Sequence, residues 1–198
     1  MYIKSEIDLV DNLLESIVAK IVNKDFDDLY SKKFNTKDLP EHKNFSVSPN
    51  TYLPFRYMFE ELDLKENHCL YWFELETVEK AQELNNLIDN YRLKKGETFC
   101  RTVPATNKNK ESNVLYVGVR RGHKNKAGLT NIVGRINQHL GYYKSNKTQG
   151  LQLYHYAKGL DFEITLNVIE FKDLVNPMYL NLIEKMVADK LEPLCGRH

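Results

Sequence analysis

The chain has 198 residues, a formal net charge of +1 and three cysteines, and this size suits one large domain whose core needs no disulfides. Because Cys69, Cys100 and Cys195 are far apart and odd in number, the sequence indicates neither a disulfide framework nor a Cys-x-x-Cys zinc site. No apolar run approaches the roughly 18 residues of a membrane span, and residues 1–10 lack the pattern of a signal peptide. We therefore expect a soluble, cytoplasmic protein with no membrane partner.

The charge is distributed unevenly along the chain. Residues 1–91 have a net charge of −8 and residues 148–198 one of −2, whereas residues 92–147 have 13 Lys and Arg against only Glu97 and Glu111, a net charge of +11. A basic block of this density attracts polyanions, because each Lys or Arg near a phosphate releases condensed counterions. A solvated, Lys-rich surface would have the same composition, so the block favours nucleic-acid binding only when other signals agree.

The first third of the chain predicts helical and extended structure. Apolar residues recur at steps of three and four over residues 5–22, which indicates an amphipathic helix. Residues 32–54 contain three prolines with several Asn and Ser, a composition typical of an extended connector. A short acidic helix is expected at residues 57–64. We interpret residues 1–66 as an N-terminal helical and extended segment that precedes the main domain.

Residues 67–198 alternate between strand and helix patterns. Aromatic and β-branched residues concentrate in three predicted strands, at residues 68–75, 113–119 and 162–171. Three helices are predicted between and after them, at residues 77–95, 129–140 and 177–191. The first of these helices is capped by Thr77 and is inserted between two strands. The order predicts an α+β domain with a small, three-stranded, mixed or antiparallel sheet flanked by helices.

Five polar side chains occupy notable positions on these elements. Tyr71 and Tyr116 lie on the first two predicted strands. Arg135 and His139 are four residues apart on one helix, about 40° around its axis, and we expect both to face away from its apolar side. Glu184 lies between apolar positions of the last helix, where a carboxylate needs a partner or a metal.

This order of motifs resembles the GIY-YIG nuclease family. Residues 69–71 (Cys-Leu-Tyr) are similar to the family's first Gly-Ile-Tyr motif, and residues 116–118 (Tyr-Val-Gly) to its second motif. Residues 134–139 (Gly-Arg-Ile-Asn-Gln-His) resemble its Arg-x-x-x-His helix, and Glu184 resembles its metal-binding glutamate. The likeness covers residues 67–198, with a longer insertion between the two tyrosines than is usual in the family.

The resemblance implies a metal-dependent endonuclease that hydrolyses DNA, and the insertion favours the restriction-enzyme type. Glu184 would bind Mg²⁺ or Mn²⁺, and Arg135 would contact the scissile phosphate. Tyr71 or Tyr116 would orient or deprotonate the attacking water, and His139 would accept the proton. The sequence leaves open which tyrosine is the base.

The partners expected for such an enzyme are DNA and a second copy of the chain. A homodimer is expected because one site cuts one strand at a time. Six basic residues would contact the DNA backbone, namely Arg120, Arg121, Lys124, Lys126, Lys144 and Lys147.

Two other functions also fit the sequence. A non-catalytic nucleic-acid-binding protein could use the same scaffold. An interaction module could bind a partner, or associate with itself, through the acidic N-terminal half and its first helix, and the basic block would then be incidental.

Overall fold

The computed structural model of the chain describes residues 2–42, 48–94, 102–107, 111–123, 130–143, 149–174 and 176–196. Within these residues, four antiparallel strands form one sheet in the order β1-β4-β2-β3. The strands are β1 (Tyr30–Asn35), β2 (His68–Leu75), β3 (Val114–Arg120) and β4 (Glu163–Phe171). The α-helices are α1 (Tyr2–Val22), α2 (Phe55–Asp63), α3 (Val78–Leu93), α4 (Asn131–Leu140), α5 (Tyr154–Ala157) and α6 (Pro177–Leu191). Two short 3-10 helices are η1 (Thr36–Asp38) and η2 (Pro49–Thr51).

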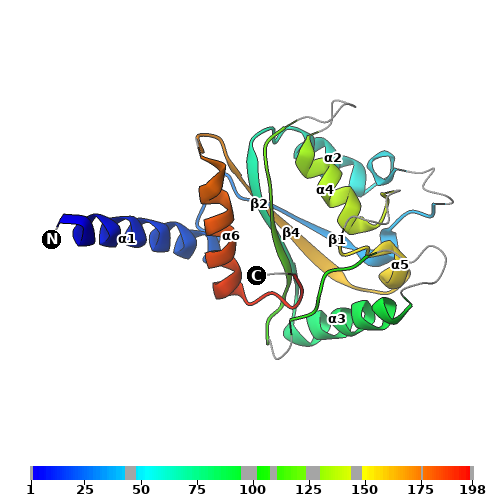
Figure 1. Ribbon diagram of the computed structural model, residues 1–198. Coiled ribbons are helices and arrows are strands. Elements are labelled where there is room, and N and C mark those ends of the chain that lie inside the picture. The colour runs from blue at the N-terminus through cyan, green and yellow to red at the C-terminus, as the bar shows by residue number, and fades with distance from the viewer. Residues whose placement is uncertain are drawn as a thin grey trace.

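Helices cover both faces of the sheet, with α2, α3, α4 and α5 on one face and α1 and α6 on the other (Figure 1). Successive residues of a strand point to opposite faces, and β2 therefore contributes to two apolar cores. Tyr71 and Phe73 belong to the core beneath α4, whereas Leu70 and Trp72 belong to the core beneath α1 and α6. The central strand β2 is consequently buried on both sides.

The α+β class expected from the sequence is confirmed, but the expectation of three strands is wrong. The fourth strand, β1, lies within residues 1–66, which we expected to precede the main domain. It pairs with β4 so that Phe34 lies opposite Ile164. Phe34 is the one fully buried side chain of this edge strand. A strand with a single buried side chain has no alternating apolar pattern by which the sequence could reveal it.

The helices that frame the site begin and end close to their expected positions. The inserted helix is α3, and the Thr77 hydroxyl caps it by accepting a hydrogen bond from the Lys80 backbone N–H at 3.3 Å. Helix α6 has the expected bounds, and Glu192 follows it in a left-handed conformation with φ 48°. None of the helices in the described part of the chain is long and apolar enough to cross a membrane.

Candidate active site

The two motif tyrosines lie next to each other on β2 and β3. The antiparallel register places Tyr71 opposite Gly118 and Phe73 opposite Tyr116. The rings of Tyr71 and Tyr116 are therefore neighbours on the α4 side of the sheet, with centroids 6.2 Å apart and planes inclined by 23°. Tyr71 is fully buried and Tyr116 is half-buried.

Gly118 makes room for the Tyr71 hydroxyl. A Cβ atom at this position would lie 2.6 Å from Tyr71 Oη and 2.7 Å from a ring carbon of Tyr116. Both distances are shorter than any ordinary contact, so a side chain here would displace one of the tyrosines. The glycine of the Tyr-Val-Gly motif is thus required by the close approach of the two rings.

The guanidinium of Arg135 joins the two tyrosines. Its Nε donates to Tyr71 Oη at 2.9 Å, and its Nη2 donates to Tyr116 Oη at 3.0 Å. Its Nη1 donates to the Gln138 side-chain oxygen at 3.1 Å and to the Gln149 carbonyl at 2.5 Å. All four acceptors are formally neutral, so these bonds fix the guanidinium in place without neutralising its charge.

His139 lies beneath the tyrosines and is completely buried. Its Nδ1 accepts a hydrogen bond from the Leu151 backbone N–H at 3.1 Å, and its Nε2 lies 3.1 Å from Tyr71 Oη. Burial, with the nearby charges of Arg135 and Arg120, lowers the pKa of His139 well below its ordinary value. The ring is therefore neutral at pH 7, and since Nδ1 accepts, the proton resides on Nε2 and points to Tyr71.

This placement corrects the expectation that Arg135 and His139 face away from the apolar side of their helix. At 100° per residue His139 lies within about 20° of Ile132 around the axis of α4, and Ile132 is buried against the sheet. His139 consequently points into the core. Its Nε2 is a donor to Tyr71 and its Nδ1 is occupied by a backbone amide, so neither nitrogen is placed to take a proton from the tyrosine.

Glu184 lies on α6, which covers the face of the sheet opposite to the tyrosine pair (Figure 1). It is half-buried, and its carboxylate is close enough to the backbone N–H of Val119 in β3 for that group to lower its pKa. β3 is an edge strand, and such a strand has backbone groups without a partner strand. Burial raises the pKa of Glu184, and the positive charge of Arg135 partly opposes that rise.

A second arginine contributes positive charge to the same place. Arg120 is the last residue of β3. Burial raises the pKa of Tyr71, and the charge of Arg120 opposes part of that rise. The same charge adds to the lowering of the pKa of His139. The Arg120 Nε is buried and has no hydrogen-bond partner among the described residues. Within those residues, neither Arg120 nor Arg135 forms a salt bridge with a carboxylate. A buried donor of this kind suits an anionic ligand.

The single carboxylate at this site, that of Glu184, fits Mg²⁺ better than a metal that needs several protein ligands. In the described part of the chain, no group of three or more His, Cys, Asp and Glu side chains is arranged to hold an ion. Mg²⁺ commonly binds through one or two carboxylates and substrate phosphates while it keeps several waters. Glu184 matches such an ion, because it is a single hard oxygen ligand beside a candidate phosphate site.

The structure brings Tyr71, Tyr116, Arg135 and His139 into one hydrogen-bonded cluster, with Glu184 at its edge. Among the basic residues expected to contact DNA, Arg120 is half-buried and Arg121 is exposed. The other four lie outside the described residues, namely Lys124, Lys126, Lys144 and Lys147.

The sequence interpretation missed three groups that hold this cluster together. Gln138 follows Arg135 by three residues, a helical spacing that could have indicated the contact. The carbonyl of Gln149 and the amide of Leu151 have no sequence signal, because every residue has such backbone groups.

Comparison of the chain with protein-family models, with curated proteins and with solved structures gives no match. The geometry of the site is therefore the basis for the proposed function.

Proposed function

We propose that this protein is a metal-dependent endonuclease of the GIY-YIG kind, which hydrolyses phosphodiester bonds in DNA and belongs to the restriction type. The observation that carries the proposal is the fixed position of Arg135 between the hydroxyls of Tyr71 and Tyr116, with the Glu184 carboxylate close enough for the charge of Arg135 to lower its pKa. Phosphodiester hydrolysis needs a positioned water, positive charge at the phosphoryl oxygens and stabilisation of the leaving oxygen. These side chains offer a group for each requirement.

The two arginines are suited to bind the scissile phosphate. Arg135 is held by four neutral acceptors, so its charge is preorganised and needs no rearrangement when an anion arrives. The buried Nε of Arg120 offers a further donor. A phosphate between the two guanidiniums would meet fixed positive charge in a region with little water, where electrostatic stabilisation is strongest.

Glu184 is the residue that would hold Mg²⁺ or Mn²⁺. An ion bound there would supply Lewis-acid stabilisation of the phosphate and of the leaving oxygen. The backbone N–H of Val119 and the positive charge of Arg135 both favour the charged form of this carboxylate. Burial of the charged carboxylate costs free energy and raises the pKa of Glu184. A bound divalent cation would offset this free-energy cost.

The tyrosines differ in a way that separates their roles. Tyr71 is fully buried, and its oxygen meets donors from both Arg135 and His139. Tyr116 is only half-buried and meets Arg135. We assign Tyr116 to the attacking water, which its hydroxyl can reach and orient, and Tyr71 to positioning of Arg135.

A plasmid cleavage assay with Mg²⁺ tests the proposal. We expect cleavage by the unmodified protein, and a loss of at least about 100-fold in rate in both Arg135→Gln and Glu184→Gln, since each removes charge from the transition state. Arg56→Gln and Glu60→Gln are matched controls, because these residues form an exposed pair on α2, and both controls should cut normally.

Two outcomes would contradict the proposed activity. Binding to DNA that weakens with salt, without cleavage in Mg²⁺ or Mn²⁺ on single- or double-stranded substrates, would indicate a non-catalytic nucleic-acid-binding protein. Absence of DNA binding at low salt would instead favour an interaction module.

A further inference from the structure

Helix α1 extends well beyond the body of the protein. It has 21 residues, which corresponds to a length of about 31 Å, and its N-terminal end lies far from the sheet (Figure 1). Val18 and Ile21, near its C-terminal end, are buried against the body, and Leu14 and Ile17 are partly covered. Residues 4–13 are exposed.

The apolar side of α1 continues along this exposed part. Ile7, Val10, Leu14, Ile17 and Ile21 follow one another at steps of three and four, the spacing of a coiled-coil seam. The last three of these residues pack on the protein, whereas Ile7 is 53% and Val10 is 51% exposed. A helical segment as short as this exposed part has little stability of its own in water, so a partner that covers Ile7 and Val10 would stabilise it.

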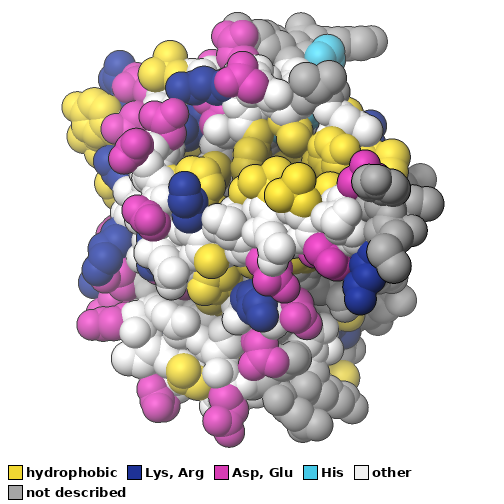
Figure 2. All heavy atoms as spheres, turned by 90° about the vertical axis from the view of Figure 1, so that its left-hand side faces the viewer, with side chains coloured by type: hydrophobic (Ala, Val, Ile, Leu, Met, Phe, Trp, Pro, Cys, Tyr) yellow, Lys and Arg dark blue, Asp and Glu magenta, His cyan; other side chains and the backbone are white. Residues whose placement is uncertain are grey.

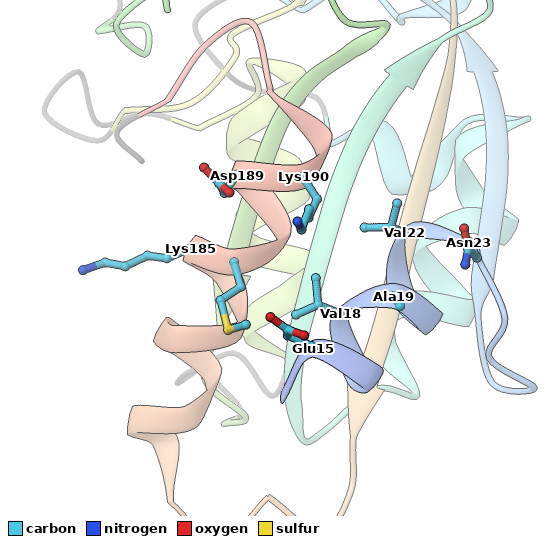
Figure 3. A pocket seen from close by; sticks show the side chains of 9 residues that line it. Glu15, Val18, Ala19, Val22, Asn23, Lys185, Asp189 and Lys190 are labelled. Carbon is cyan, nitrogen blue, oxygen red and sulfur yellow. The ribbon is translucent and has the colours of Figure 1, made fainter. Parts of the chain in front are cut away.

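A groove and a second apolar stripe adjoin the seam. The groove, of about 720 Å³, lies between α1 and α6, and Val18, Val22 and Met186 are among its apolar lining residues (Figure 3). On α6, Met178 and Leu182 precede Met186 at steps of four and are exposed. Figure 2 shows hydrophobic side chains gathered in a band across this face of the molecule. A contiguous apolar band of this kind marks an interaction surface.

The charges of α1 indicate how a partner would lie. Its exposed N-terminal part is acidic, with Glu6, Asp8, Asp11 and Glu15 against Lys4. Two basic residues of α6, Lys185 and Lys190, line the groove together with the acidic Asp189 of α6 and Glu15 of α1. The two lysines can pair with the acidic N-terminal part of a second copy whose α1 runs in the opposite direction.

We propose that a second copy of this chain covers this surface, with the two α1 helices antiparallel. Ile7 and Val10 of each copy would enter the groove between α1 and α6 of the other, and the acidic N-terminal part would lie along Lys185 and Lys190. Such an isologous pair makes every contact twice. The proposal is independent of the nuclease activity, because it rests only on the shape, polarity and charge of the two helices.

Light scattering coupled to size-exclusion chromatography tests the pairing on the full chain. The unmodified protein, of 23.2 kDa per chain, should have twice that mass, and the double variant Ile7→Lys/Val10→Lys should have the mass of one chain. Both residues are exposed in a single copy, so the variant should fold. Its circular dichroism spectrum should differ from that of the unmodified protein by no more than the helical signal of α1. Leu93→Lys is the matched control, because Leu93 is an exposed apolar residue of α3, and it should remain dimeric.

Two results of this measurement would overturn the proposal. One is a single-chain mass for the unmodified protein across a concentration series. The other is a double variant that folds and is still dimeric, since the copies would then meet through another surface.

Charge reversal tests the antiparallel orientation separately. Lys185→Glu/Lys190→Glu and Asp8→Lys/Asp11→Lys should each weaken the dimer at least tenfold in dissociation constant, and the four changes together should restore most of the affinity. If the combined variant stays as weak as its parents, the acidic and basic groups do not meet and the antiparallel arrangement is wrong.

Discussion

At the scale of single residues, the candidate site depends on one arginine held by several neutral oxygens. Arg135 donates to Tyr71, Tyr116, Gln138 and the Gln149 carbonyl, and no described carboxylate pairs with it. A structural arginine is commonly paired with a carboxylate, because burial of an uncompensated charge is costly. The absence of a described carboxylate partner supports the proposal that Arg135 binds an anionic substrate.

The two tyrosines should respond differently to loss of their hydroxyls. We expect Tyr116→Phe to lower kcat about 100-fold or more with little change in KM, because its hydroxyl would act on the attacking water. Tyr71→Phe should lower kcat only about tenfold and raise KM, since it loosens Arg135 rather than removing a reacting group. Steady-state cleavage kinetics on one oligonucleotide duplex separate the two effects. An inactive Tyr71→Phe beside an active Tyr116→Phe would reverse the assignment.

Gly118 and Gly134 form a matched pair for a stability measurement. Gly118→Ala should lower the free energy of unfolding by about 1–3 kcal/mol, because the new methyl group would overlap the Tyr71 hydroxyl. Gly134→Ala should raise it by about 0.5–1 kcal/mol, since that position is inside α4 and a Cβ there meets nothing within 4 Å. Urea denaturation measures both. Equal effects of the two changes would mean that the close approach at Gly118 is unimportant.

At the scale of elements, the site is assembled at the edge of the sheet. α4 lies on one face and supplies Arg135 and His139, whereas α6 lies on the other face and supplies Glu184 (Figure 1). The edge strand β3 lies between them, with Tyr116 beside Arg135 of α4 and Val119 near the carboxylate of Glu184.

Glu184→Gln should stabilise the protein while it lowers the cleavage rate at least about 100-fold. Burial raises the pKa of Glu184 above its unfolded value, so the charged carboxylate destabilises the folded state at neutral pH. Gln keeps the size and a side-chain oxygen of Glu and removes the charge. The folded protein takes up a proton at Glu184 before the unfolded chain does, so the advantage of the variant should shrink as pH falls through the raised pKa towards 4.5. Urea denaturation of both proteins at several pH values measures this difference, and a variant less stable than the parent at pH 7 would contradict it.

At the scale of the whole molecule, the proposed dimer and the proposed activity have a joint consequence. One site with one metal cuts one strand at a time, and two copies provide two sites. The unmodified protein should therefore convert supercoiled plasmid largely to linear DNA, whereas Ile7→Lys/Val10→Lys should accumulate nicked circles at a similar initial rate. Gel analysis of the time course measures the two products. Linear DNA formed equally fast by the variant would show that the α1 contact is not needed for double-strand cutting.

The local features of this protein can be predicted from its sequence. The periodicity of apolar residues located α1, α4 and α6, the aromatic runs located β2 and β3, and Thr77 located the start of α3. These features depend on a few neighbouring residues. The spacing of the apolar residues shows which side of a helix or which face of a strand is buried.

The way in which these elements meet follows from tertiary contacts. These contacts add β1 to the sheet, turn His139 into the core and fix Arg135 between two tyrosines from different strands. They also place Glu184 near Val119 of β3. The reason is physical: strand order, register and contacts between helix and sheet are non-local, so they depend on which surfaces pack together and not on the pattern within any one segment.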